Sequence, residues 1–161
     1  MKLEFSLGEI DKAIKQIESY RQNLSNKTRE LTERLATLGA MNVSLEFSRA
    51  IAQENDVKVD VEWISSDTMV IRASGNEVAF IEFGAGIKYG AGHPQNSEFG
   101  TGPGTYPNGK GHWDNPKGWF YLDENGTLQH TYGNPPNMPM YNTARMLEQE
   151  VERIAKEVFS S

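Results

Sequence analysis

Apolar residues near the start of the chain recur at alternating steps of three and four, the repeat of one face of an α-helix. They are Leu7, Ile10, Ile14, Ile17, Leu24, Leu31, Leu35 and Leu38. Ser6 and Glu9 have the spacing of a capping box, and Phe5 and Ile10 stand at the positions of a hydrophobic staple. Gly39 is typical of a helix end. We therefore expect one helix of about 32 residues, roughly 48 Å long.

The pattern changes twice between residues 40 and 83. A weaker helical stripe predicts a second helix over residues 40–53. Residues 57–63 and 68–73 alternate between apolar and polar side chains and are separated by a Ser-Ser-Asp turn, which predicts an antiparallel hairpin. The apolar run 78–83 is too short for its period to distinguish a helix from a strand.

The second half of the chain begins with an irregular stretch, residues 85–118, rich in Gly, Pro, Asn and aromatic residues and without a period. A loop of this length is usually functional, and we expect it to order against a partner. Residues 119–123 and 127–132 predict a second hairpin around Asn125-Gly126. Pro139 suits the first turn of a final helix. The predicted fold is a single α+β domain over residues 1–161, with both long helices packed on a small antiparallel sheet.

The composition of the chain argues against several classes of function and site. The net charge is −6, and residues 41–140 carry 12 acidic and 6 basic groups, which argues against gripping a nucleic-acid backbone. The absence of cysteine excludes disulfides and thiolate metal sites. No apolar run has the length of a signal peptide or a membrane span, so we expect no membrane contact.

Two patterns resemble ligand sites without meeting their requirements. Residues 104–110 have the spacing of a phosphate-binding loop, but Gly111 replaces the hydroxyl residue that holds magnesium. His93, His112 and His130 match no familiar metal-ligand spacing with Glu98 or Asp114, so we interpret them as exposed loop residues. We expect no cofactor, no metal and no catalytic residue.

Glu82 lies among apolar neighbours, Phe80, Ile81 and Phe83. It could be a general acid, point to solvent, or meet a basic group of a partner, but no second carboxylate or nucleophile lies nearby in sequence. The aromatic residues of the middle segment either seal the irregular stretch onto the sheet, form a protein interface, or offer a sugar platform. The candidate assembly interface comprises Phe80, Glu82, Phe83, Tyr89, Phe99, Tyr106, Trp113, Trp119, Tyr121, Tyr132, Met138 and Met140.

The seam of the first helix has two possible partners. It can pack on the final helix of the same chain, which we favour, or form a coiled coil between subunits. Arg21 and Thr28 occupy seam positions and weaken the coiled-coil interpretation.

Four stretches together carry a resemblance to a known family. They are residues 10–15, residues 80–84 (Phe-Ile-Glu-Phe-Gly), residues 118–121 with Asn125-Gly126, and residues 131–141. In order and spacing the chain resembles the tail-completion (gene-product-ten-like, head-tail joining) family of long-tailed bacteriophages and prophages. It departs from the family at residues 53–56, where many members have Pro-x-x-Thr-Gly, at Ala85, where Thr is frequent, and in the long insertion 87–117.

The resemblance implies a structural protein of the virion, assembled in the host cytoplasm, that forms a ring of six copies in the neck and contacts other neck and tail proteins. DNA would pass through the ring without specific binding, helped by an acidic lumen. A tail terminator or a stopper of the neck is an alternative. A hydrolase using Glu82 with Asp114 or Asp123, and a glycan-binding module using Trp113, are further alternatives.

Overall fold

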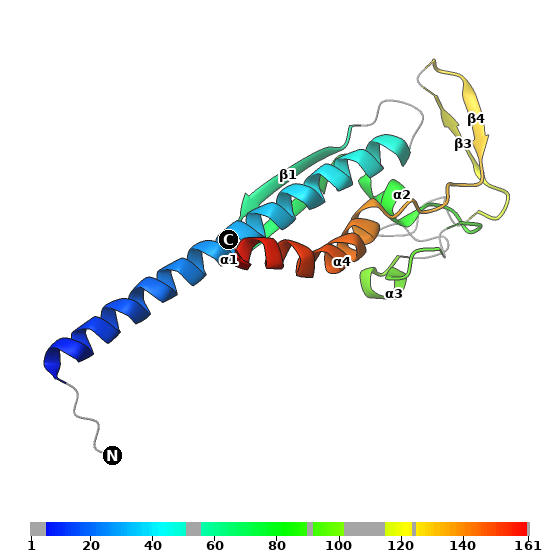
Figure 1. Cartoon of the computed structure of the whole chain (residues 1–161). Helices are drawn as coiled ribbons and strands as arrows, with labels where there is room; N and C mark the ends of the chain where they lie inside the picture. The colour runs from blue at the N-terminus through cyan, green and yellow to red at the C-terminus, as the bar shows by residue number, and fades with distance from the viewer. Residues whose placement is uncertain (1–5, 51–55, 90–91, 102–114, 124, 161) are drawn as a thin grey trace.

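The computed structural model describes residues 6–50, 56–89, 92–101, 115–123 and 125–160. It confirms the α+β class: the helices α1 (Leu7–Ala50) and α4 (Pro139–Ser160) pack against each other, and the hairpin of β1 (Lys58–Trp63) and β2 (Met69–Ser74) packs against α1 (Figure 1). The strands form two separate two-stranded sheets, since β3 (Trp119–Leu122) and β4 (Leu128–Thr131) pair only with each other. Two short helices, α2 (Val78–Phe83) and α3 (Asn96–Phe99), lie between the sheets in sequence.

The capping box at the start of α1 is present. The Ser6 hydroxyl accepts the Glu9 N–H at 3.3 Å, and the Glu9 carboxylate accepts the Ser6 N–H at 2.9 Å. The predicted end of the helix is wrong, because α1 continues through Gly39 to Ala50 and includes most of the second helix expected over 40–53. Its 44 residues make a rod of about 66 Å.

Gly39 does not end α1 because tertiary packing uses its missing side chain. A Cβ there would lie 2.5 Å from Ile71 Cδ1 of β2 and 2.9 Å from Leu147 Cδ1 of α4. Glycine inside a helix costs about 1 kcal/mol relative to alanine. Close packing of three elements at this point offsets that cost.

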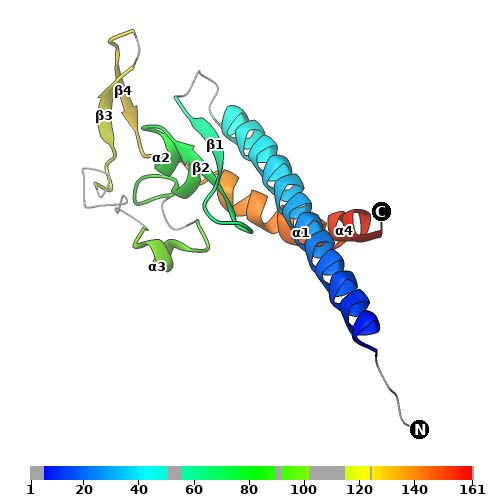
Figure 2. The same ribbon diagram turned by 90° about the vertical axis from the view of Figure 1, so that its left-hand side faces the viewer.

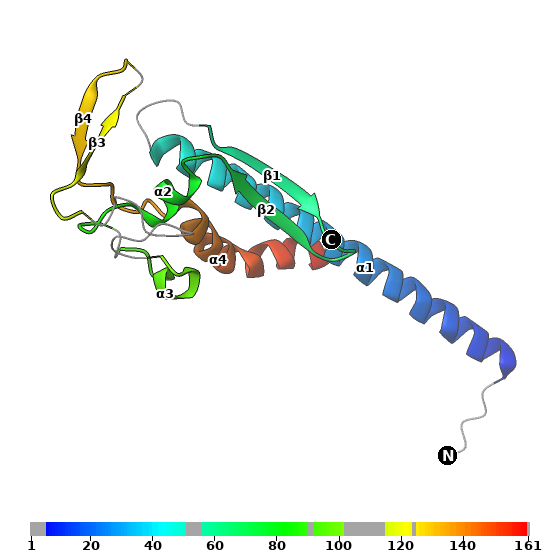
Figure 3. The same ribbon diagram turned by 180° about the vertical axis from the view of Figure 1, so that it is seen from behind.

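The final helix α4 begins at Pro139, as expected, and runs antiparallel to α1. Lys27 Nζ donates to the Phe159 carbonyl at 3.5 Å, and Asn42 Nδ2 donates to Thr143 Oγ1 at 2.8 Å. The covered part of α1 therefore begins near Lys27, and the preceding turns project beyond the body (Figures 1 and 3). Within the chain, α4 thus covers the apolar seam of α1 only along the second half of that helix.

The β1–β2 hairpin lies along the C-terminal half of α1, as Figure 2 shows. One cluster of the core consists of Val43 and Phe47 of α1 with Ile81 of α2, against which half-buried residues of the hairpin and Met140 pack. Ile154 and Val158 of α4 are also buried. The strand register, with Val59 opposite Ala73, matches the alternation predicted from the sequence. None of the helices in the described ranges is long and apolar enough to span a membrane.

The segment whose period was ambiguous, 78–83, is the helix α2, and α3 is a single turn within the stretch expected to be irregular. The second hairpin is confirmed, with Trp119 opposite Thr131 and Leu122 opposite Leu128. Asp123 holds its turn by accepting the N–H groups of Asn125 at 3.0 Å and Thr127 at 2.8 Å. This hairpin stands away from the long helices α1 and α4 (Figures 1 and 2).

Candidate assembly surfaces

Glu82 organises the interior where α2 meets α4. Its carboxylate accepts the backbone N–H groups of Met140 at 2.8 Å and Tyr141 at 3.0 Å, in the first turn of α4. A negative charge at this position satisfies helix donors that have no partner within the helix and interacts favourably with the helix dipole. These two hydrogen bonds make Glu82 the cap of α4. Because only 6% of Glu82 is exposed, its side chain is not part of the surface of the isolated chain.

His93 completes this buried group, which corrects its interpretation as an exposed loop residue. Only 3% of His93 is exposed, and its ring lies 4.6 Å from that of Phe83 and 5.4 Å from that of Tyr141. Its Nδ1 accepts the Gln95 N–H at 3.1 Å, so the proton lies on Nε2, which donates to Glu82 Oε1 at 3.1 Å.

This arrangement is suited to structure. Both ring nitrogens of His93 and both carboxylate oxygens of Glu82 have partners within the chain. Asp123, proposed above as a second acid, is engaged in the turn of the β3–β4 hairpin. In the part of the chain that the structure describes, no three His, Asp or Glu residues gather as a metal site would require. Asp114, His112 and residues 104–110 lie outside the described residues.

Hydrogen bonds to backbone carbonyl groups join the stretches 80–86 and 131–141, which lie far apart in sequence. The Asn134 side chain donates to the Phe80 carbonyl at 2.8 Å, and the Asn137 N–H donates to the Ile81 carbonyl at 2.8 Å. Gly133, with φ at 98°, lies against the Ala85 carbonyl, where any side chain would collide. Two of the four stretches that carry the family resemblance are therefore in direct contact.

The β3–β4 hairpin, which we call the apolar ribbon, exposes one face made of Phe120, Leu122, Leu128 and His130. Phe120, Leu122 and Leu128 are 65%, 67% and 62% exposed. The His130 ring contacts Phe120 edge-on at 4.8 Å and contributes to this face. A two-stranded hairpin is marginally stable by itself, and this one carries an uncovered apolar face.

The first turns of α1, residues 7–24, form a second exposed apolar surface, which we call the α1 arm. Leu7 and Ile17 are 83% and 67% exposed, and Ile10, Ile14 and Leu24 are also exposed. These residues continue the stripe on which α4 packs further along the helix. The α1 arm and the apolar ribbon lie toward opposite ends of the molecule (Figures 1 and 3).

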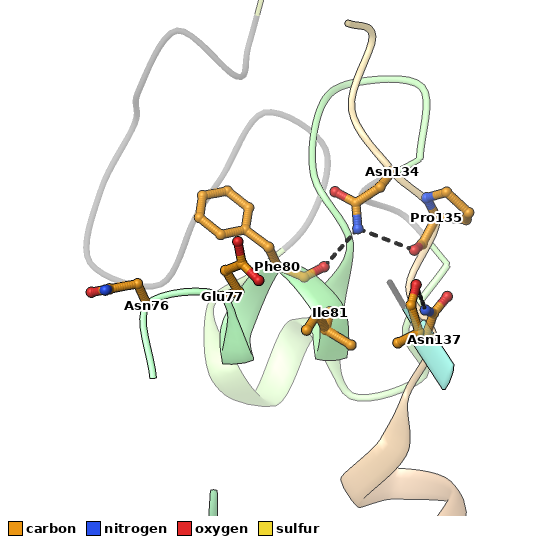
Figure 4. A pocket seen from close by; sticks show the side chains of 8 residues that line it. Asn76, Glu77, Phe80, Ile81, Asn134, Pro135 and Asn137 are labelled. Carbon is orange, nitrogen blue, oxygen red and sulfur yellow. Dashed lines mark hydrogen bonds between the residues drawn. The ribbon is translucent and has the colours of Figure 1, made fainter. Parts of the chain in front are cut away.

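A pocket of about 600 Å³ opens near the end of α1 (Figure 4). Its described lining is Ala50, Asn76, Glu77, Phe80, Ile81, Asn134, Pro135 and Asn137. Among the described residues, Glu77 Oε2 is a buried side-chain oxygen without a hydrogen-bond partner. The pocket could therefore receive an apolar side chain accompanied by a hydrogen-bond donor.

The residues expected at an assembly interface differ in how exposed they are. Phe99, Tyr121 and Tyr132 are exposed, whereas Glu82 is buried. Phe80, Phe83, Tyr89, Trp119, Met138 and Met140 are half-buried, and Tyr106 and Trp113 lie outside the described residues. Sequence reasoning missed Leu122 and Leu128, although their positions on either side of the Asn-Gly turn place them opposite each other in a hairpin.

The chain matches no protein-family model, no curated protein and no solved structure.

Proposed function

We propose that this chain is a structural neck protein of a long-tailed bacteriophage or prophage, of the tail-completion type, that forms a ring at the head-proximal end of the tail and helps to join tail to head. The observation that carries the proposal is the apolar ribbon, with Phe120, Leu122 and Leu128 largely exposed on an element that stands away from the body. Exposed apolar patches of this kind often mark a surface that binds another protein.

A ring requires contacts between two different surfaces of the same chain, because a head-to-tail contact is what closes a rotation. The apolar ribbon and the pocket near Phe80 and Pro135 are two such surfaces. The proposed ring has six copies, as the family resemblance implies, and its other contacts are with neighbouring neck and tail proteins.

The hydrogen bonds and burial of Glu82 argue against a hydrolase and so favour the assembly role. An acid catalyst must reach its substrate, and this carboxylate is buried and occupied by two backbone N–H groups and by His93. The proposed hydrolase would require α4 to lose its cap before any substrate could approach.

The test is a substitution of the apolar ribbon in the phage genome. Leu122→Ser combined with Leu128→Ser removes the apolar pair at the outer end of the ribbon and leaves the described core untouched. We expect heads and tails that remain unjoined in electron micrographs. The control is Gln129→Asn, which alters the opposite face of the same strand and keeps an amide group near Asp123, to which the Gln129 side chain donates at 3.1 Å.

Two results would contradict the proposal. Fully joined, infectious particles from the Leu122→Ser, Leu128→Ser variant would show that the ribbon face has no role in assembly. Turnover of a cell-wall substrate by the purified chain, abolished by Glu82→Gln in a variant that remains folded, would establish the hydrolase in its place.

A further inference from the structure

The α1 arm, residues 7–24, has an apolar seam that is continuous with an interface already formed in the chain. The same face of α1 that carries Ile10, Ile14 and Ile17 continues to Gly39 and Asn42, where α4 packs. The contact with α4 ends near Lys27, which donates to the Phe159 carbonyl at the last turn of α4. The arm therefore extends a helix-binding face past the end of the helix that occupies it.

We propose that the α1 arm of the isolated protein binds the α1 arm of a second copy in antiparallel orientation. The second arm continues the path of α4 along the same face. The inference does not rest on the proposed function, because it concerns the free chain before any other assembly partner covers the arm.

The α1 arm is long enough to bind the α1 arm of a second copy along its whole length. Its 18 residues span about 27 Å. When Leu7 of one copy lies opposite Leu24 of the other, the second helix begins just beyond the C-terminus of α4. The two bodies then lie at opposite ends of the paired arms, and neither body overlaps the arm of the other.

The seam residues favour the antiparallel orientation. With Leu7 opposite Leu24, Ile14 lies opposite Ile17 and Arg21 lies opposite Ile10. Arg21 then neighbours Asp11 of the second copy, and opposite charges meet at each end of the pair. In a parallel pair in the same register, the two copies of Arg21 would face each other in the seam, which is unfavourable.

The absence of cysteine from the chain allows a clean test by disulfide trapping. We would mix the single variants Leu7→Cys and Leu24→Cys under mild oxidation and separate the products without reductant. The antiparallel pair predicts a cross-link between the two variants. Leu24→Cys alone should give none, because two copies of position 24 would be about 26 Å apart.

Sedimentation supplies an independent readout over protein concentrations from about 1 μM to 1 mM. Ile17→Asp places an unpaired carboxylate in the seam and should weaken self-association by about tenfold or more. Ser19→Asp makes the same charge change on the opposite face of the arm and should leave self-association unchanged. Far-UV circular dichroism would verify that both variants keep their helix content.

Three outcomes would overturn the inference. The parent chain could remain a monomer over the whole concentration range. Leu24→Cys could cross-link to itself, which would indicate a parallel pair. The parent could associate with equal strength when it carries Ile17→Asp, which would place the contact outside the arm. None of these outcomes bears on whether the apolar ribbon joins heads to tails.

Discussion

Replacing Glu82 by Gln should destabilise the fold far more than the size of the change suggests. The carboxylate accepts the Met140 and Tyr141 N–H groups at the start of α4 and a hydrogen bond from His93. The Gln amide keeps one acceptor oxygen, and its NH₂ group faces a donor. One hydrogen bond to a charged group is worth about 1.5–3 kcal/mol. The charge at the helix terminus contributes about 0.3–1 kcal/mol more.

We therefore expect the free energy of unfolding to fall by about 2–4 kcal/mol, a large share of the roughly 5–15 kcal/mol typical of a domain. Urea denaturation followed by far-UV circular dichroism, with linear extrapolation to water, measures this difference. The slope of the free energy with urea concentration should not change, since the surface exposed on unfolding is the same.

Glu77→Gln is the matched control, because it removes the same charge from a residue just before α2. Glu77 Oε2 is buried and has no hydrogen-bond partner among the described residues, so replacing this carboxylate by a neutral amide should not lower the free energy of unfolding. If Glu82→Gln proved as mild as Glu77→Gln, the assignment of Glu82 as the cap of α4 would be refuted.

Three further predictions follow from local geometry. Ser6→Ala should accelerate amide hydrogen exchange in the first turns of α1 without changing global stability, because the α1 arm lies outside the body. Gly133→Ala should lower the melting temperature markedly, because its φ is 98° and a backbone carbonyl fills the space for Cβ; Gly126→Ala, at φ 73° with open space around it, should lower it less. The hydrogen bond from the Thr127 N–H is the main reason why the pKa of Asp123 lies below its ordinary 3.8. The stability that this carboxylate contributes is therefore present above pH 3.8 and is lost as the pH falls through the lower pKa of the folded state. NMR signals of the ribbon should show this loss in the parent chain and not in Asp123→Asn.

Elements determined by local chemistry could be predicted from the sequence. The capping box at Ser6, the two hairpins and the start of α4 at Pro139 each depend on residues adjacent in the chain. The end of α1 could not be predicted in the same way. Gly39 is a frequent stop signal, but here it admits Ile71 and Leu147, which are distant in sequence. The cost of a glycine inside a helix, about 1 kcal/mol relative to alanine, is smaller than the stabilisation that tertiary packing provides at this position.

The buried polar group shows the same limit at the candidate site. His93 has no sequence feature that distinguishes it from an exposed loop histidine, since its partner Glu82 and its neighbour Tyr141 are brought to it by the fold. Glu82 was recognised as unusual because its neighbours are apolar. Its role as the cap of a helix more than fifty residues away depends on contacts that no local pattern encodes.

The path of α4 along α1 has a consequence for synthesis of the chain. The helix that covers the second half of α1 consists of 22 residues at the very end of the described sequence. Until those residues have left the ribosome, the part of α1 that α4 covers in the folded chain lacks this partner, and the Glu82 carboxylate has no helix to cap. A nascent chain that lacks α4 therefore exposes the α4-facing surface of α1 in addition to the α1 arm, and the exposed apolar surface of α1 is limited to the arm only once α4 has been made and has packed.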